Sequence, residues 1–258
     1  MHTKEEKLAA FGRLLDIMDE LREKCPWDKK QTLESLRHLT IEETYELGDA
    51  ILDGNLNEVK KEVGDLLLHL VFYAKIGSEK GAFDIADVSH SLCDKLVERH
   101  PHVYGDTKVE NEEEVKQNWE KLKLKKKTDS VLSGVPKSLP ALVKAERIQD
   151  KVAGVGFDWD SRSQVLDKVK EEFAELEEAI DEGKTDAMED EMGDVFFSLI
   201  NYCRYIGINA ESALERTNKK FISRFQSMEE MTRQENTRLS DMNLEEIDQL
   251  WERSKKLE

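Results

Sequence analysis

Cysteine, proline, glycine and long apolar runs are all scarce in this chain of 258 residues. Four prolines and thirteen glycines are too few for the many tight turns of an all-β fold. Cys25, Cys93 and Cys203 are widely spaced and form no CxxC or Cys/His pattern, which argues against disulfides and structural zinc. No apolar run approaches the roughly eighteen residues of a membrane span, and the charged N-terminus does not resemble a signal peptide. We therefore expect a soluble cytoplasmic protein without a membrane association.

Positive charge is also in short supply. The 39 Lys and Arg residues face 56 Asp and Glu residues, which gives a net charge of −17. A net negative charge of this size repels nucleic acid and anionic lipid, so neither is expected as a partner. Nucleotides would be repelled too, and a phosphate substrate would therefore need metal ions and a local basic cluster.

The chain contains an internal duplication. Residues 41–73 align without a gap to residues 170–202, and their carboxylates coincide. Shorter blocks match on both sides in the same order: 25–28 with 156–160, 94–100 with 219–225, and 113–121 with 245–253, where Trp119 pairs with Trp251. Matching blocks in one order indicate two copies of a single module.

The boundary between the copies is predicted from residues 125–140. This segment begins with a basic run and holds two of the four prolines, which is typical of turns and linkers. We predict an N-terminal module at 1–128, a linker at 129–135 and a C-terminal module at 136–258.

Both copies carry helical periodicity. In the second, apolar residues recur every three or four positions from Val165 to Ile180, with Asp160 or Ser161 as N-cap and Gly183 as C-cap. A second helix is expected at 189–205, and the first copy repeats the pattern at 36–52 and 56–76. No segment alternates with the period of a strand. The prediction is an all-α fold of two tandem helical bundles, each built on an antiparallel hairpin.

Four carboxylates recur at the same spacing in each hairpin. Glu172 and Glu175 share one helix face, and Glu191 and Asp194 share a face of the next helix. Such a cluster is repulsive unless a cation neutralises it, and all-oxygen ligands favour Mg²⁺, with Mn²⁺ as the alternative. The first copy offers the equivalent candidate ligands Glu43, Glu46, Glu62 and Asp65. Gly64 and Gly193 lie inside these pairs and suggest that helices or a ligand approach closely there.

Solvated surface charge and a di-iron site are two competing assignments for the carboxylate pairs. A single ExxE pair usually marks a solvated helix face, but the repeated two-helix arrangement favours metal binding. Di-iron bundles use ExxH pairs, and His69 is replaced by Ser198 in the second copy, so it belongs to no shared ligand set. Motifs of P-loop, Rossmann and covalent-nucleophile enzymes are absent from the sequence.

The most specific motif is CPWDKKQTLESL at 25–36. Together with the doubled EExxE and ExxD pattern and VGFDWD at 155–160, it resembles the MazG family over essentially the whole chain. Lys24 departs from the pattern, because the family often has Gly there. The resemblance implies an all-α homodimeric enzyme that hydrolyses nucleoside triphosphates to monophosphates and pyrophosphate with Mg²⁺, often with broad specificity.

The resemblance also implies roles for individual residues. Glu172, Glu175, Glu191 and Asp194 would bind metal, and Asp190 or Glu171 would orient or deprotonate the attacking water. Lys168, Lys220 and Arg224 would contact the triphosphate, and Trp251 would lie near the nucleotide. The alternatives are surface ion pairs for Lys220 and Arg224, and a core or interface position for Trp251.

The two copies differ beside the carboxylates. Lys168 aligns with Leu39, and Asp190 aligns with Lys61, so the first copy lacks a basic residue and places a cation beside its cluster. We therefore expect the second copy to be the principal active site. Two alternatives stay open: a pyrophosphohydrolase of narrow specificity for dUTP, dCTP or ppGpp, and a non-catalytic helical interaction module.

Overall fold

The computed structural model describes residues 1–107, 109, 114–115 and 130–256 and divides the chain into two compact units, 1–109 and 110–258. The described residues form helices and no strand, which confirms the all-α prediction and the two tandem modules. Trp119 and most of residues 108–129 lie outside the described residues, so the limits of the predicted linker at 129–135 stay a prediction. None of the described helices is long and apolar enough to cross a membrane.

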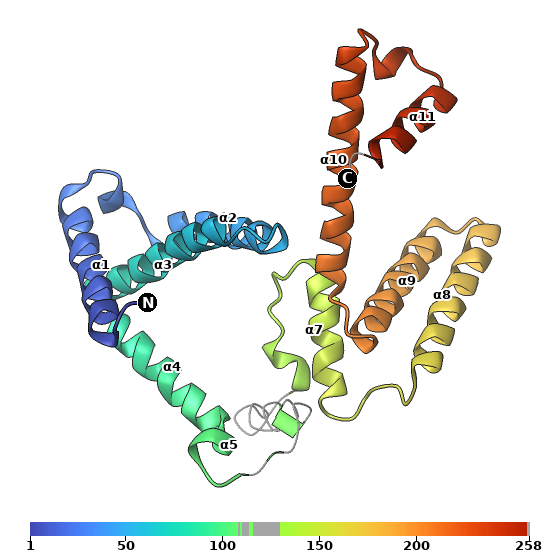
Figure 1. Cartoon of the computed structure of the whole chain (residues 1–258). Helices are drawn as coiled ribbons and strands as arrows, with labels where there is room; N and C mark the ends of the chain where they lie inside the picture. Colours follow the sequence, from blue (N-terminus) through green and yellow to red (C-terminus); the bar gives the residue numbers. More distant parts are fainter. Residues whose placement is uncertain (108, 110–113, 116–129, 257–258) are drawn as a thin grey trace. The chain divides into compact units, whose positions relative to one another are not determined.

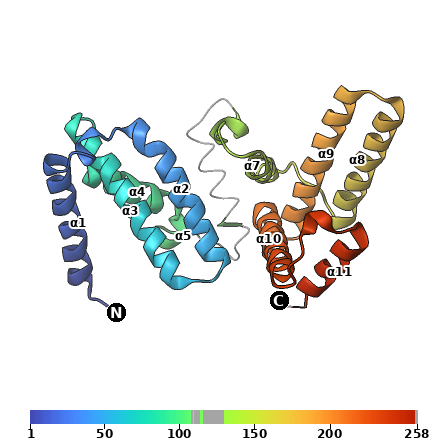
Figure 2. The ribbon, with the colours of Figure 1, turned by 90° about the horizontal axis from the view of Figure 1, so that it is seen from above.

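The first unit is built around a helical hairpin. Its helices are α1 (Lys4–Lys24), α2 (Leu33–Leu52), α3 (Leu56–Glu79), α4 (Ile85–Arg99) and α5 (Pro101–Tyr104). Helices α2 and α3 pack side by side (Figure 1 and Figure 2), because a short turn through Gly54, with a φ of +67°, reverses the chain. Helix α1 packs on α3 and closes one side of the hairpin.

The second unit repeats this hairpin. Its helices are α7 (Ala141–Ala153), α8 (Arg162–Glu182), α9 (Thr185–Tyr205), α10 (Ala210–Gln234) and α11 (Leu244–Ser254), with 3₁₀ turns at Val131–Gly134 and Leu239–Asp241. Helices α8 and α9 form the hairpin, α7 packs on α9, and α10 contacts α7, α9 and α11 (Figure 1).

The ends of α8 are where the sequence predicts them. The Ser161 side chain accepts a hydrogen bond from the backbone N–H of Gln164, and the Gln164 side chain accepts one from the N–H of Ser161. This capping box satisfies backbone groups that the first turn leaves unpaired. Gly183 ends the helix with a φ of +69°, a left-handed conformation that favours glycine. The Gly183 cap opens the turn that brings the carboxylates of α8 opposite those of α9.

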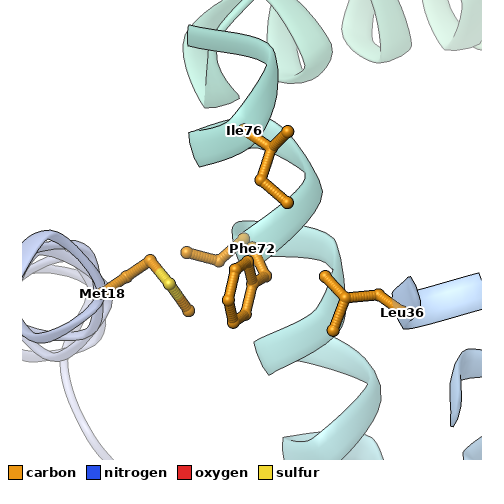
Figure 3. Packing of buried hydrophobic residues seen from close by; sticks show 5 residues of the cluster. Met18, Leu36, Phe72 and Ile76 are labelled. Atoms are coloured by element: carbon orange, nitrogen blue, oxygen red, sulfur yellow. The ribbon is translucent and has the colours of Figure 1, made fainter. Parts of the chain in front are cut away.

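A compact apolar core holds the first unit together. Met18 from α1 and Leu36 from α2 meet Val71, Phe72 and Ile76 of α3 (Figure 3). These five side chains are almost completely buried, and Leu39, Leu68 and Tyr73 pack against them. The contact of three helices at Phe72 therefore fixes α1 against the hairpin.

The glycines inside the carboxylate pairs need no close helix contact. A Cβ atom added at Gly64 or Gly193 would meet nothing within 4 Å among the residues that the structure describes. The expectation of a close helix approach at these positions is therefore wrong within the described chain. Glycine in a helix leaves the unfolded chain unusually free, which costs stability without a packing gain.

Replacing Gly64 with alanine is expected to stabilise the first unit by about 0.5–1 kcal/mol, the difference in helix propensity between the two residues. Urea unfolding followed by circular dichroism measures the change. Gly77→Ala is the matched control on the same helix, because its Cβ would lie 2.7 Å from the Phe83 ring and should destabilise the unit. Equal destabilisation by both changes would contradict the open space at Gly64.

Candidate active site

Three of the four predicted carboxylates of the second hairpin meet at one point. Oxygens of Glu172 and Glu175 from α8 and of Glu191 from α9 lie within 4.8 Å of one another. Oxygens on opposite sides of a Mg²⁺ ion lie about 4.2 Å apart, so this spacing fits a divalent cation. Asp194, the fourth residue, lines a cavity together with Glu172. The donor set is all oxygen, as the sequence predicts.

The carboxylates repel one another. A hydrogen bond with Glu172 is the largest cause that raises the pKa of Glu175, followed by burial and the negative charge of Glu172. The charge of Glu191 acts in the same direction, and the Lys168 ammonium opposes it. A divalent cation at this point would relieve the repulsion.

Lys168 already neutralises part of the cluster. Its Nζ lies 2.7 Å from Oε1 of Glu171 and 2.9 Å from Oε1 of Glu172, and these hydrogen bonds raise the pKa of Lys168. The structure thus brings Lys168 and Glu171 to the metal-ligand candidates. Asp190 is exposed on α9, and neither Asp190 nor Glu171 lines the cavity.

A cavity of about 470 Å³ adjoins the carboxylates. It lies between α7, α8, α9 and the segment before α8, and Lys168, Glu172 and Asp194 form one part of its wall. Most of the remaining wall is apolar or aromatic: Ile148, Val152, Phe157, Trp159, Val165 and Phe197. This is the usual size and character of a small-molecule site.

A few polar side chains of this cavity are held in fixed orientations. Nε2 of Gln149 donates to the backbone oxygen of Phe197 at 2.8 Å, while its Oε1 is buried with no hydrogen-bond partner in the described structure. Arg204 donates to Oδ1 of Asn201 from Nε at 3.0 Å and from Nη2 at 2.9 Å. The same Nη2 lies 2.5 Å from Oδ1 of Asp158. Gln149, Asn201 and Arg204 belong to no sequence motif, so the motifs alone did not reveal them.

The first hairpin holds an equivalent cluster. Oxygens of Glu43, Glu46 and Glu62 lie within 4.8 Å of one another. Glu62 is 3% exposed, its Oε2 has no hydrogen-bond partner in the described structure, and its Oε1 lies 2.9 Å from Nζ of Lys61. Burial, then the charge of Asp65, raise the pKa of Glu43. The structure thus places the Lys61 cation on the cluster, as the alignment predicts.

The space beside the first cluster is filled. When the gapless alignment is continued upstream at the same offset, Val165, Lys168 and Asn201 of the cavity correspond to Leu36, Leu39 and Phe72. Those three belong to the apolar core of the first unit or pack against it. A smaller cavity of about 190 Å³ in the first unit includes none of its carboxylate cluster. The two copies therefore differ beside their carboxylates, where a ligand could enter the second unit.

The remaining candidates lie on α10 and α11. The Arg224 guanidinium lies 5.6 Å from the centre of the Trp251 ring, and the Phe221 ring lies 5.2 Å from it. Lys220 is exposed one turn before Arg224. Lys220, Arg224 and Trp251 thus share one region of the α10–α11 pair, and none of them lines the cavity.

The raised pKa of Glu43 predicts a pH dependence. The folded chain holds this proton more tightly than the unfolded chain, whose Glu43 has a pKa near 4.5. The stability that results is present below that value and is lost as the pH rises through the folded pKa. In EDTA, the unfolding temperature is expected to fall from about pH 4.5 to pH 7, and less in Glu43→Gln. An equal fall in both proteins, measured by scanning calorimetry, would assign the pH dependence to other groups.

Comparison with known proteins gives one consistent result. The family model described as "MazG nucleotide pyrophosphohydrolase domain" matches residues 31–104 and 160–228, one match in each unit. An Escherichia coli protein named nucleoside triphosphate pyrophosphohydrolase is 40% identical over 96% of this chain and 98% of its own length. The Thermotoga maritima nucleoside triphosphate pyrophosphohydrolase/pyrophosphatase MazG is 42% identical over 95% of both chains. Bacillus subtilis YabN is 43% identical over 99% of this chain and 54% of its own.

Proposed function

This chain belongs to the MazG nucleotide pyrophosphohydrolase family, and we propose that its second unit hydrolyses nucleoside triphosphates to monophosphates and pyrophosphate. The observation that carries this proposal is the cavity of about 470 Å³ whose wall includes Glu172 and Asp194 of the carboxylate set. A nucleotide in this cavity would meet the carboxylates with its phosphates. Relatives of nearly the same length carry this activity in their names.

The carboxylates Glu172, Glu175, Glu191 and Asp194 would hold Mg²⁺, with Mn²⁺ as the alternative. An ion bound there would neutralise the charge of the leaving pyrophosphate and polarise the α-phosphoryl group. Lys168 lies within reach of both Glu172 and the cavity, and would donate to a phosphate oxygen. Glu171 and Asp190 are the two candidates to orient or deprotonate the attacking water.

The first unit would contribute little to this reaction. Its carboxylates Glu43, Glu46, Glu62 and Asp65 offer a second cation site, but Leu36, Leu39 and Phe72 fill the space beside them. The Lys61 cation lies on Glu62 and competes with a metal ion. We assign this unit to weaker metal binding and to the stability or dimerisation of the chain.

Side chains of the α10–α11 pair support the proposed homodimer. Lys220, Arg224 and Trp251 carry triphosphate and nucleotide contacts in the family pattern, yet they do not line the cavity of their own chain. Several large apolar side chains near them are also exposed, among them Phe221, Ile222 and Phe225. A second copy of the chain would cover these side chains and bring the basic residues to a nucleotide.

The test is pyrophosphate release from a panel of NTPs and dNTPs, with Mg²⁺, with Mn²⁺ and with EDTA. We expect metal-dependent release with the monophosphate as the second product. Release from dUTP or dCTP alone, or from ppGpp alone, would replace broad specificity by a narrow one. No release from any nucleotide by the folded protein would leave the helical interaction module as the function.

A further inference from the structure

The two copies of the hairpin provide a comparison inside one chain. Both have the same fold and the same carboxylates, so a difference between buried side chains at equivalent positions indicates a requirement beyond folding. In the first unit, Met18, Leu36 and Phe72 meet from three helices and are almost completely buried (Figure 3). Any polar residue at an equivalent position of the second unit therefore needs a reason other than packing.

Two of these three apolar positions carry amides in the second unit. The segment Ile148-Gln149-Asp150 aligns with Ile17-Met18-Asp19, so Gln149 takes the place of Met18. Asn201 takes the place of Phe72 in the gapless alignment, and the third position, Leu36, becomes the smaller Val165. All three replacements line the cavity of the second unit. Loss of apolar volume thus opens the cavity, and the same exchanges put polar groups in its wall.

The buried amide of Gln149 is a cost unless a ligand completes its hydrogen bonds. Gln149 is 4% exposed, and its Oε1 accepts no hydrogen bond in the described structure. A buried polar atom left in this state costs about 1–3 kcal/mol, which an apolar residue such as methionine would avoid. The unpaired oxygen is therefore an independent sign that the cavity holds a ligand with an N–H or O–H donor.

The orientation of both amides is set by neighbours. The Phe197 carbonyl holds Nε2 of Gln149, so the oxygen is the group left to accept. Arg204 donates hydrogen bonds to Oδ1 of Asn201 and to Oδ1 of Asp158. Because the Asn201 oxygen already accepts from Arg204, its amide nitrogen is the group available to donate among the described residues. One acceptor and one donor on an apolar cavity wall suit a planar ring with donors and acceptors along its edge.

We propose that Gln149 and Asn201 are specificity-determining residues that bind the edge of the nucleobase, while the apolar wall holds its faces. The proposal rests on the proposed function, because the phosphates fix which end of the nucleotide enters the cavity. Every nucleobase carries both an N–H donor and a ring or carbonyl acceptor. The pair therefore selects for the presence of a base and admits several bases, with Phe157, Trp159 and Phe197 as the aromatic surroundings.

The test measures binding without hydrolysis. Nucleoside monophosphates and ribose 5-phosphate, which lacks a base, are titrated into the full-length protein in EDTA by isothermal titration calorimetry. The wild type is expected to bind the monophosphates at least about tenfold more tightly than ribose 5-phosphate. Asn201→Leu and Gln149→Met are expected to weaken monophosphate binding about fivefold to tenfold each, the usual value of one hydrogen bond. Binding of ribose 5-phosphate should not change.

Two further variants make the result interpretable. Gln226→Met is the matched control on an exposed face of α10 and should bind like the wild type. Asn201→Phe restores the residue of the first copy and should abolish base-dependent binding by filling the cavity. Should Asn201→Leu fail to fold, Gln149→Met decides, because the first copy packs methionine at that position.

The possible outcomes separate the two proposals. Equal affinity of the wild type for monophosphates and ribose 5-phosphate would overturn the role of the amides, and so would an equal loss of both ligands in the variants. Base-dependent binding without pyrophosphate release from any triphosphate would instead contradict the proposed function and leave the base site in place.

Discussion

Pyrophosphate release is expected to fall about a thousandfold when Glu172 is replaced by alanine. Glu172 is buried, has an oxygen in the three-carboxylate cluster, and also lines the cavity. Its loss would remove a ligand and unbalance the charge that holds Lys168. A loss of about 4 kcal/mol in transition-state stabilisation corresponds to this thousandfold change.

Glu43→Ala, the equivalent change in the first copy, is the matched variant for Glu172→Ala. Because Leu39 and Phe72 fill the space beside Glu43, release is expected to stay within about twofold of the wild type. Glu177→Ala, on an exposed position of α8, controls for a general loss of helix charge. The reverse result, with Glu43→Ala inactive and Glu172→Ala active, would move the reaction to the first unit. Steady-state release in saturating Mg²⁺ measures all three variants.

The second large effect concerns stability. Leu36 is 0% exposed and packs in the core that joins α1, α2 and α3. Leu36→Ala is expected to destabilise the first unit by about 2–5 kcal/mol, through lost burial and the cavity left behind. Urea unfolding measures the free energy of unfolding of the variant and of the wild type.

A matched substitution separates core packing from helix propensity. Leu56 is 81% exposed at the start of α3, so Leu56→Ala removes the same atoms from the surface and should change stability by less than about 0.5 kcal/mol. Similar losses in the two variants would mean that the first unit is not stabilised by the core around Phe72.

The clustering of the carboxylates could be predicted from the sequence because its signal is periodic and repeated. Glu172 and Glu175 lie one turn apart on α8, and a short turn at Gly183 returns the chain to face them with Glu191. Helix geometry alone therefore brings these oxygens together. The duplication adds weight to them, because several acidic residues on solvated helix faces, such as Glu177 and Asp190, have no acidic counterpart in the first copy.

The cavity could not be predicted in the same way. Gln149 and Asn201 belong to no motif, and their polarity has meaning only once Met18 and Phe72 are known to be buried. The repeat alignment did contain a signal for the cavity, because it sets apolar residues of the first copy opposite amides of the second. At Gly193 the expected close approach of a helix was wrong, because an added Cβ would meet no described atom within 4 Å, and the alternative of a close approach by a ligand stays a prediction.

The ion pair between Lys168 and Glu172 implies that binding of a metal ion to these carboxylates would be an ion exchange. In this pair, the Lys168 ammonium serves as the counter-ion of the buried Glu172 carboxylate. A divalent cation held by Glu172, Glu175 and Glu191 would displace this counter-ion and leave a protonated lysine at the edge of the cavity. Binding of the metal ion would thus also free the Lys168 ammonium to bind the incoming phosphate.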